Sequence, residues 1–102
     1  MTTVLFGRND NARWMMVSGH AGYAESGKDI VCAGVSITAQ GLAATLCQVE
    51  GVVCNVSKNA ESLYVYCQST EETKCYVDAV FDMARTSLEM LAEEYPNHVK
   101  VD

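Results

Sequence analysis

Two short apolar segments, separated by a polar turn, open the chain and predict two β-strands. They run from Thr3 to Arg8 and from Arg13 to His20. The residues between them, Asn9 to Asn11, favour a tight turn, so the two strands should pair as a hairpin. The second strand is bulky at its start and narrows to Gly19, which would leave room beside the imidazole that follows.

From Asp29 onward the apolar residues are spaced by three or four, which is typical of a helix packed against a core. This stripe comprises Val31, Val35, Thr38, Leu42, Leu46 and Val49. Asp29 suits the N-cap of the helix, and Gly51 suits its end. Gly34 and Gly41 lie inside the helix, where each costs roughly 1 kcal/mol relative to alanine, so we expect close packing against a neighbouring element.

A second pair of strands is predicted from Val52 to Ser57 and from Ser62 to Gln68, joined by residues 58–61. In the later strand, two tyrosines alternate with Leu63, Val65 and Cys67. Successive side chains of a strand point to opposite faces of its sheet. One row should therefore enter the core, while the tyrosines face the other way.

The segment Ser69-Thr70-Glu71-Glu72 is a capping-box sequence, which predicts the start of a second, longer helix. The buried stripe of this helix is predicted at Val77, Phe81, Ala84, Leu88, Leu91 and Tyr95. Its solvent-facing side is predicted at Asp78, Asp82, Arg85, Glu89 and Glu93. Pro96 ends the helix, and residues 98–101 are compatible with a short terminal edge strand.

The predicted order of elements indicates an α+β fold, ββαββα with an optional short last strand. We expect a mostly antiparallel sheet with two helices packed on one face. With 102 residues the chain can bury one core, so residues 1–102 are expected to form a single domain. About half of the residues are hydrophobic and a fifth are charged, which is the composition of a globular domain rather than a disordered one.

The charge and the apolar stretches exclude several classes of partner. The chain carries a net charge of −6, so a phosphate backbone would repel it and direct binding to nucleic acid is not expected. The apolar stretches are four or five residues long, far short of the roughly 20 that a membrane-spanning helix needs. The N-terminus lacks the basic and apolar regions of a signal peptide. We therefore expect a cytoplasmic protein that has no membrane partner.

Five cysteines are present, an odd number at irregular spacing and without a Cys-x-x-Cys pair. This pattern argues against both a disulfide framework and a zinc site. We expect reduced thiols, no metal and no cofactor. Four of the cysteines are interpreted as small hydrophobic residues, namely Cys47, Cys54, Cys67 and Cys75.

His20 and Cys32 have the chemistry of an activated thiol nucleophile with its base. If Asp29 caps the helix, Cys32 occupies the third helical position, where free N–H groups and the helix dipole favour a thiolate. Those N–H groups are also candidates for an oxyanion hole. His20 is the natural general base, although a histidine at a strand end is also common as a structural residue.

Two nearby residues each have two interpretations. Asp29 either caps the helix or orients His20 as the third member of the site, and the two roles are compatible. Ser36 lies one turn beyond Cys32 and either donates a hydrogen bond into the site or bonds to solvent or its own helix. The glycine-bracketed loop at residues 21–28 lacks periodic apolar anchors and is a candidate mobile segment.

The segments Gly19-His20-Ala21 and Ile30-Val31-Cys32-Ala33-Gly34-Val35-Ser36 resemble the ribosomal-processing cysteine protease family, Prp. The resemblance extends over essentially the whole chain in length and element order. It implies that His20 is the base and Cys32 the nucleophile, with Asp29 and Ser36 in support. One departure is Gly34, where the family usually has alanine.

The same resemblance implies that the loop from Ala21 to Lys28 is a lid over the substrate. The substrate-loop residues implied in this way are Gly19, Ala21, Gly22, Tyr23 and Gly27. A groove for an apolar peptide would draw on Trp14, Met16 and Tyr23 as the nearest bulky residues. Core packing is nevertheless the favoured interpretation of Trp14 and Met16.

Members of the family resemble sequence-specific endopeptidases that remove a short N-terminal extension from the large-subunit ribosomal protein L-twenty-seven. The resemblance therefore implies the precursor of that ribosomal protein as the partner, and a homodimer as the assembly. Two other classes of function stay open. One is a thiol redox protein that uses Cys32 with a resolving partner such as Cys47. The other is a non-catalytic adaptor that binds the ribosomal protein without cutting it.

Overall fold

The computed structural model describes all residues from 1 to 102. Five strands and two helices follow one another as β1 (Thr2–Arg8), β2 (Ala12–Ser18), α1 (Ile30–Leu46), β3 (Val53–Lys58), β4 (Ser62–Gln68), α2 (Lys74–Glu94) and β5 (Val99–Val101). The element order predicted from the sequence is confirmed, including the short last strand. The strand boundaries differ from the prediction by one or two residues at the ends.

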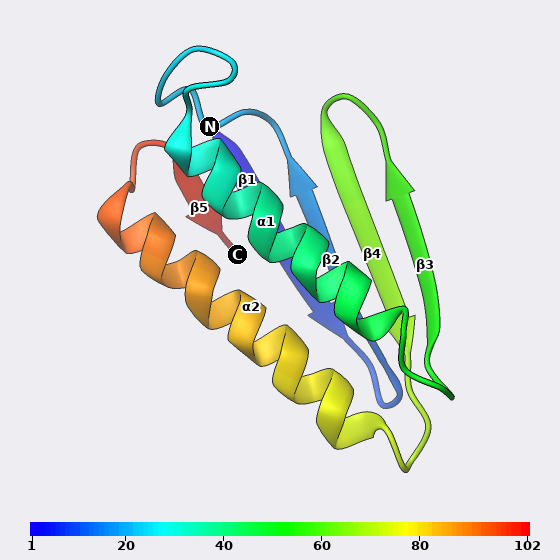
Figure 1. The fold of residues 1–102 in the computed structure, drawn as a ribbon. Helices are drawn as coiled ribbons and strands as arrows, with labels where there is room; N and C mark the ends of the chain where they lie inside the picture. Colours follow the sequence, from blue (N-terminus) through cyan, green and yellow to red (C-terminus); the bar gives the residue numbers. More distant parts are fainter.

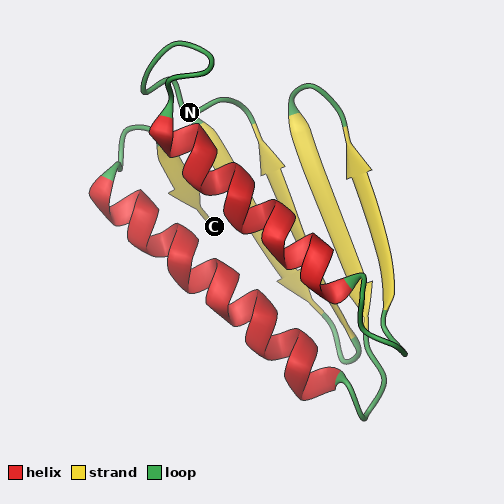
Figure 2. Cartoon of the chain, viewed as in Figure 1, coloured by secondary structure: helices red, strands yellow, loops and turns green.

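The strands form one sheet in the order β3-β4-β2-β1-β5. All neighbours are antiparallel except β5, which pairs in parallel with β1 at the edge. Both helices lie on the same face of this sheet and run alongside each other (Figures 1 and 2). The expected α+β fold, with a mostly antiparallel sheet and two helices on one face, is confirmed.

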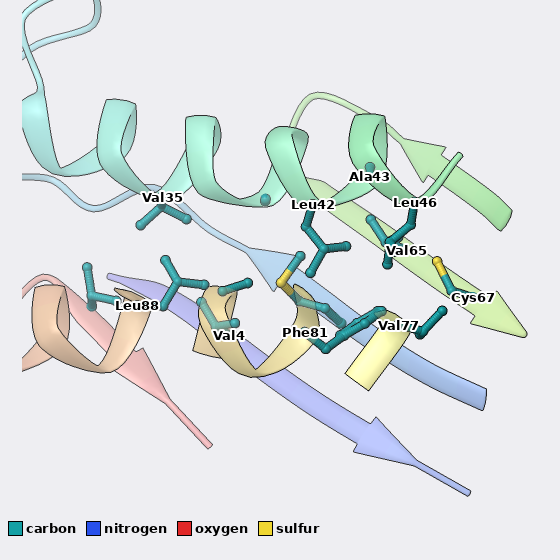
Figure 3. Close-up of a cluster of buried hydrophobic side chains, with 14 of the residues drawn as sticks. Val4, Val35, Leu42, Ala43, Leu46, Val65, Cys67, Val77, Phe81 and Leu88 are labelled. Carbon is teal, nitrogen blue, oxygen red and sulfur yellow. The ribbon is translucent and has the colours of Figure 1, made fainter. Parts of the chain in front are cut away.

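The hydrophobic core fills the space between the helix layer and the sheet. In Figure 3, Val35 and Leu42 from α1 and Phe81 and Leu88 from α2 point toward the strands, where they meet Val4. The predicted stripes on both helices are buried at most positions, because a spacing of three or four residues keeps one side of a helix facing the sheet. The inward row of β4 is confirmed as well, since its valine and cysteine are fully buried.

The opposite face of the sheet carries no helix. Met15 is fully buried, so its neighbours Trp14 and Met16 point to this uncovered face, and Met16 is 39% exposed. The indole of Trp14 lies over Gly7, where a Cβ would collide with it, and stacks on Tyr66 at 6.1 Å between ring centroids. The favoured interpretation of Trp14 and Met16 as core residues is therefore wrong, because the strand's bulky start falls on both faces.

The start of α2 differs from the prediction. The helix begins at Lys74 after Thr73, whose side chain makes no capping bond. Ser69 instead donates its hydroxyl to the carbonyl of Asn11, and the Thr70 N–H donates to the Thr73 hydroxyl. The capping-box prediction is wrong because the Ser69 side chain bonds to the β1–β2 turn and the Thr73 side chain bonds to Thr70, so neither caps the helix. The first helix also ends earlier than predicted, at Leu46.

Gly34 lies where the two helices approach each other. A Cβ at Gly34 would sit 3.3 Å from Cδ2 of Leu91 on α2, which is closer than ordinary packing. The expected close approach is thus confirmed for Gly34. It is wrong for Gly41, where a Cβ would meet nothing within 4 Å.

One buried charge joins the sheet to α2. The guanidinium of Arg13 is nearly inaccessible and donates to Asp78 and Asp82, each at 3.1 Å. It also lies over the ring of Phe81, 5.2 Å from the centroid. Two residues predicted to form the wet face of the helix therefore neutralise an arginine in the core. A buried guanidinium requires such partners because its desolvation is costly.

Candidate active site

The backbone leaves β2 at Ser18, so His20 lies two residues beyond the strand rather than at its end. Gly19 turns the chain with φ of +83°, a left-handed conformation that favours glycine. Its N–H donates to the carbonyl of Glu61, and a Cβ here would lie 2.5 Å from the carbonyl oxygen of Met1. Gly19 is therefore required by the turn and by the adjacent backbone.

Cys32 is the third residue of α1, as predicted. Asp29 caps the helix: its Oδ1 accepts from the N–H groups of Val31 at 3.0 Å and Cys32 at 2.9 Å. A thiol one turn from a helix N-terminus lies in the positive end of the dipole, which favours its thiolate form. The cap thus fixes the position of the sulfur relative to the helix axis.

The second oxygen of Asp29 holds the preceding loop. Its Oδ2 accepts from the N–H groups of Tyr23 at 3.0 Å and Ala24 at 3.3 Å. The pKa of the Asp29 carboxyl is lowered from its usual value, first by the hydrogen bond from the Cys32 N–H and further by those from the loop and from Val31. The capping role of Asp29 is confirmed, and the carboxylate makes no hydrogen bond to His20.

The thiol of Cys32 accepts a hydrogen bond from the backbone N–H of Ala21 at 3.2 Å. Ala21 is 2% exposed, whereas Cys32 is half-buried and His20 is exposed. An N–H donor aimed at sulfur stabilises the charged form of a thiol more than the neutral form. Sequence analysis did not find this donor, because nothing in the sequence shows which loop N–H turns toward the helix.

His20 and Cys32 line the same cleft but are not hydrogen-bonded to each other. One part of the cleft runs from Cys32 along α1 toward the β3–β4 turn, with Val17, Ala39, Asn59 and Leu63 among its walls. The other part lies under the loop before α1, beside Gly22, Gly27 and Asp29. His20 and Cys32 stand where the two parts meet, because both residues line each part, so an extended chain lying in the cleft would pass over both side chains.

The other predicted site residues occupy different positions. Ser36 lines both parts of the cleft, but its hydroxyl accepts from Nε2 of Gln40 at 2.6 Å and makes no hydrogen bond to Cys32. Trp14 and Met16 lie on the far face of the sheet and do not line the cleft. Tyr23 packs outward from the cleft, against the rings of Tyr95 and His98.

Three of the N–H groups at the start of α1 are already bonded. Those of Val31 and Cys32 donate to the Asp29 carboxylate, and that of Ala33 donates to the Asp29 carbonyl. The expected oxyanion hole at these groups is therefore not formed in this structure. The capping carboxylate that orders the helix start also occupies its donors.

The remaining thiols are far from Cys32 or buried. Cys47 follows the last residue of α1, roughly 22 Å along the helix from Cys32 at 1.5 Å per residue. Cys54 and Cys67 face each other on β3 and β4 with their sulfurs 2.9 Å apart. Burial raises the pKa of both of these thiols. No group of side chains is arranged to hold a metal ion.

Neither helix is long and apolar enough to span a bilayer.

The model of the cysteine protease Prp family matches residues 1–100. A comparison with curated protein sequences found no match.

Solved structures share this fold over its full length. One is the essential ribosomal processing protease Prp from S. aureus with a covalently linked product peptide. It matches at a TM-score of 0.85 and 23% identity, over 100% of this chain and 98% of that chain. The same protease with a substrate peptide matches at 0.77 and 22% identity, with the same coverage. SMU.848 from Streptococcus mutans matches at 0.72 and 27% identity, over 100% of this chain and 92% of that chain.

Proposed function

The chain belongs to the cysteine protease Prp family, and we propose that it is an endopeptidase in which Cys32 is the nucleophile and His20 the general base. The observation that carries this assignment is the environment of the Cys32 sulfur. It lies at a capped helix N-terminus, receives the Ala21 N–H at 3.2 Å and opens into the cleft that His20 also lines. No other thiol of the chain combines these features.

In the proposed reaction, His20 takes the proton of the Cys32 thiol, and the sulfur attacks the scissile carbonyl carbon. The carbon–nitrogen bond then breaks, and His20 returns the proton to the leaving amine. A water molecule, deprotonated by His20, attacks the thioester and releases the acyl fragment, which regenerates the thiol. Substrate binding must bring the imidazole within hydrogen-bond reach of the sulfur, because the two are not bonded in the free chain.

We propose that the substrate is the precursor of large-subunit ribosomal protein L-twenty-seven and that the enzyme removes its short N-terminal extension. Two matched structures are of a ribosomal processing protease with product and substrate peptides, which supports a peptide of this origin. The net charge of −6 favours a basic ribosomal protein over a nucleic acid. Asp29 supports the site through the helix cap, and Ser36 borders the groove that would receive the peptide.

The substrate loop is proposed to close over bound peptide. Gly22 to Lys28 are exposed and form a turn that extends past the end of the sheet (Figure 1). Its two glycines, Gly22 and Gly27, lack a Cβ, which gives the backbone the rotational freedom that a hinge needs. Hydrogen exchange of the Cys32→Ser variant, with and without an extension peptide, tests this. Slow exchange across the loop in the free protein, unchanged by peptide, would favour a preformed site.

We propose that residues 1–102 form a single protease domain that assembles as a cytoplasmic homodimer. The uncovered face of the sheet supports the dimer, because Leu5, Met16 and Tyr64 stand opposite one another in register on its three central strands. None of the five strands contains a carboxylate, so two such faces would not bring acidic side chains together despite the acidic net charge.

The experiment that tests the proposed function is incubation with purified precursor of the ribosomal protein, followed by intact-mass measurement. A single cut that removes the N-terminal extension is the expected product. Binding without any cleavage would favour the adaptor function instead. The redox alternative lacks a resolving partner for Cys32, since Cys47 lies at the other end of α1.

A further inference from the structure

Ala21 is held from both sides. Its N–H donates to the sulfur of Cys32 at 3.2 Å, and its carbonyl lies 3.0 Å from Nδ1 of His98. The residue is 2% exposed, so it is fixed by packing as well as by these two bonds. Because a carbonyl only accepts, Nδ1 of His98 carries the proton in this contact. The orientation of the donor to Cys32 is thereby linked to a histidine 77 positions away.

His98 is itself anchored in the connection between α2 and β5. Its carbonyl accepts from the N–H of Thr2 at 2.9 Å, and its N–H donates to the carbonyl of Tyr95 at 3.0 Å. The first bond joins it to the start of β1, next to the parallel pairing of β1 with β5. The backbone that carries the His98 imidazole is therefore held by hydrogen bonds at the edge of the sheet.

A second contact attaches the loop to the same segment. The ring of Tyr23 meets Tyr95 edge-on at 5.3 Å between centroids and meets His98 edge-on at 5.5 Å. Such edge-to-face pairs add stabilisation beyond the apolar area that they bury. Tyr95 and His98, here called the C-terminal seat, thus hold both Ala21 and Tyr23.

We propose that the C-terminal seat is a positioning device for catalysis, which holds the loop so that the Ala21 N–H stays directed at the Cys32 sulfur. This inference rests on the proposed function of Cys32 as the nucleophile. Neither seat residue touches the sulfur, and both act through the loop. A hydrogen bond to a charged acceptor is stronger than one to a neutral acceptor. Loss of the seat therefore destabilises the thiolate form of Cys32 more than its thiol form.

The seat is tested by the rate at which iodoacetamide alkylates Cys32, followed by peptide mass spectrometry so that the other thiols do not interfere. His98→Leu removes the Nδ1 donor, and His98→Asn places an amide N–H close to it. At pH 7.5 we expect alkylation of Cys32 to slow roughly tenfold in His98→Leu, the size of one lost charge-assisted bond, and to recover largely in His98→Asn. Near pH 10, where ordinary thiols are ionised, the rates should converge.

Tyr23 provides a second variant pair that does not threaten the fold, because this residue is 44% exposed. Tyr23→Ala removes the ring that contacts the seat, whereas Tyr23→Phe keeps it, so only the first should slow alkylation. His20 and Asp29, the ionisable groups beside Cys32, are unchanged in every variant. Wild-type alkylation rates in both His98→Leu and Tyr23→Ala would overturn the proposal.

The alkylation assay needs no peptide substrate, so it separates this inference from the proposed function. If the variants slow the alkylation of Cys32 but the wild-type protein never cleaves the precursor, the proposal for the C-terminal seat stands and the proposed protease function is refuted. Cleavage by the wild type, with alkylation unaffected in both disruptive variants, would refute the seat alone.

Discussion

A single carboxylate organises the site at the scale of the residue. One oxygen of Asp29 caps α1 at Val31 and Cys32, and the other holds the loop at Tyr23 and Ala24. Four N–H donors are thus satisfied by one side chain with two acceptor atoms. Asparagine has a single acceptor oxygen, so it can serve only one of the two sets and must turn an amide N–H toward the other.

We therefore expect Asp29→Asn to lower the midpoint of thermal unfolding at pH 7. Because hydrogen bonds lower the pKa of Asp29 from its usual value of 3.8, its contribution to stability is present above that value. The contribution is lost as the pH falls through the lowered pKa. The difference between the two proteins should therefore shrink as the pH falls below 3.8. Asp10→Asn, in the exposed β1–β2 turn, is the matched control. Equal midpoints of wild type and Asp29→Asn at pH 7 would contradict this account.

Replacing His20 should change the rate of catalysis without changing the stability of the fold. Its side chain is exposed and takes part in no hydrogen bond, so His20→Ala should shift the free energy of unfolding by less than about 0.5 kcal/mol. Loss of a general base typically lowers kcat by about 10² to 10⁴. The measurement is kcat on an extension peptide beside a urea unfolding curve. Undiminished turnover would remove His20 from the mechanism.

The sequence predicts only part of the site at this scale. The position of Cys32 on α1 follows from the cap three residues before it, because capping is a local interaction. The seat residue His98 could not be predicted, since its contact with Ala21 depends on the tertiary fold. The close approach of Gly19 to the backbone of Met1 could not be predicted for the same reason.

At the scale of the element, the spacing of apolar residues predicts the buried face of a helix more reliably than capping sequences predict where the helix begins. The stripe of α2 from Val77 to Leu88 is buried as predicted, because one face of a helix must meet the core. The start of α2 differs from the prediction, since Ser69 bonds to Asn11 of the β1–β2 turn and Thr70 bonds to Thr73, and neither side chain caps the helix. Short polar side chains bond to whichever backbone group is nearest, and the sequence does not show which group that is.

The two glycines of α1 lead to stability predictions of different size. Gly41 is exposed with open space around it, so Gly41→Ala should raise the free energy of unfolding by about 1 kcal/mol through helix propensity alone. Gly34→Ala gains the same propensity but pushes its Cβ to 3.3 Å from Leu91, so its gain should be smaller. Urea unfolding of both variants checks this. A larger gain from Gly34→Ala would mean that α2 yields easily at this contact.

At the scale of the whole molecule, the fold has one covered and one uncovered face of the sheet. Two helices bury the inward side chains, whereas Leu5 and Met16 stay 42% and 39% exposed on the other side. The order of elements was predictable because each strand pair and helix has its own apolar spacing. The strand order β3-β4-β2-β1-β5 could not be predicted, since strand pairing depends on contacts between segments that are distant in the sequence.

The proposed homodimer makes a prediction at this scale. Met16→Lys places a charge in the middle of the uncovered face and should convert a dimer into a monomer, as measured by light scattering on a sizing column. Met90→Lys changes an equally apolar residue, 66% exposed on α2, and should leave the dimer intact. If Met90→Lys dissociates the protein and Met16→Lys does not, the interface lies on the helix layer.

The central claim is that the thiol of Cys32 performs peptide cleavage, and its most direct test compares Cys32→Ala with Cys75→Ala. Both residues are on the first turn of a helix, but Cys75 is the second residue of α2 and is exposed outside the cleft. Each variant is incubated with the precursor ribosomal protein, and the products are measured by intact mass. The account predicts no product from Cys32→Ala and wild-type cleavage by Cys75→Ala. Cleavage at the wild-type rate by Cys32→Ala would contradict it.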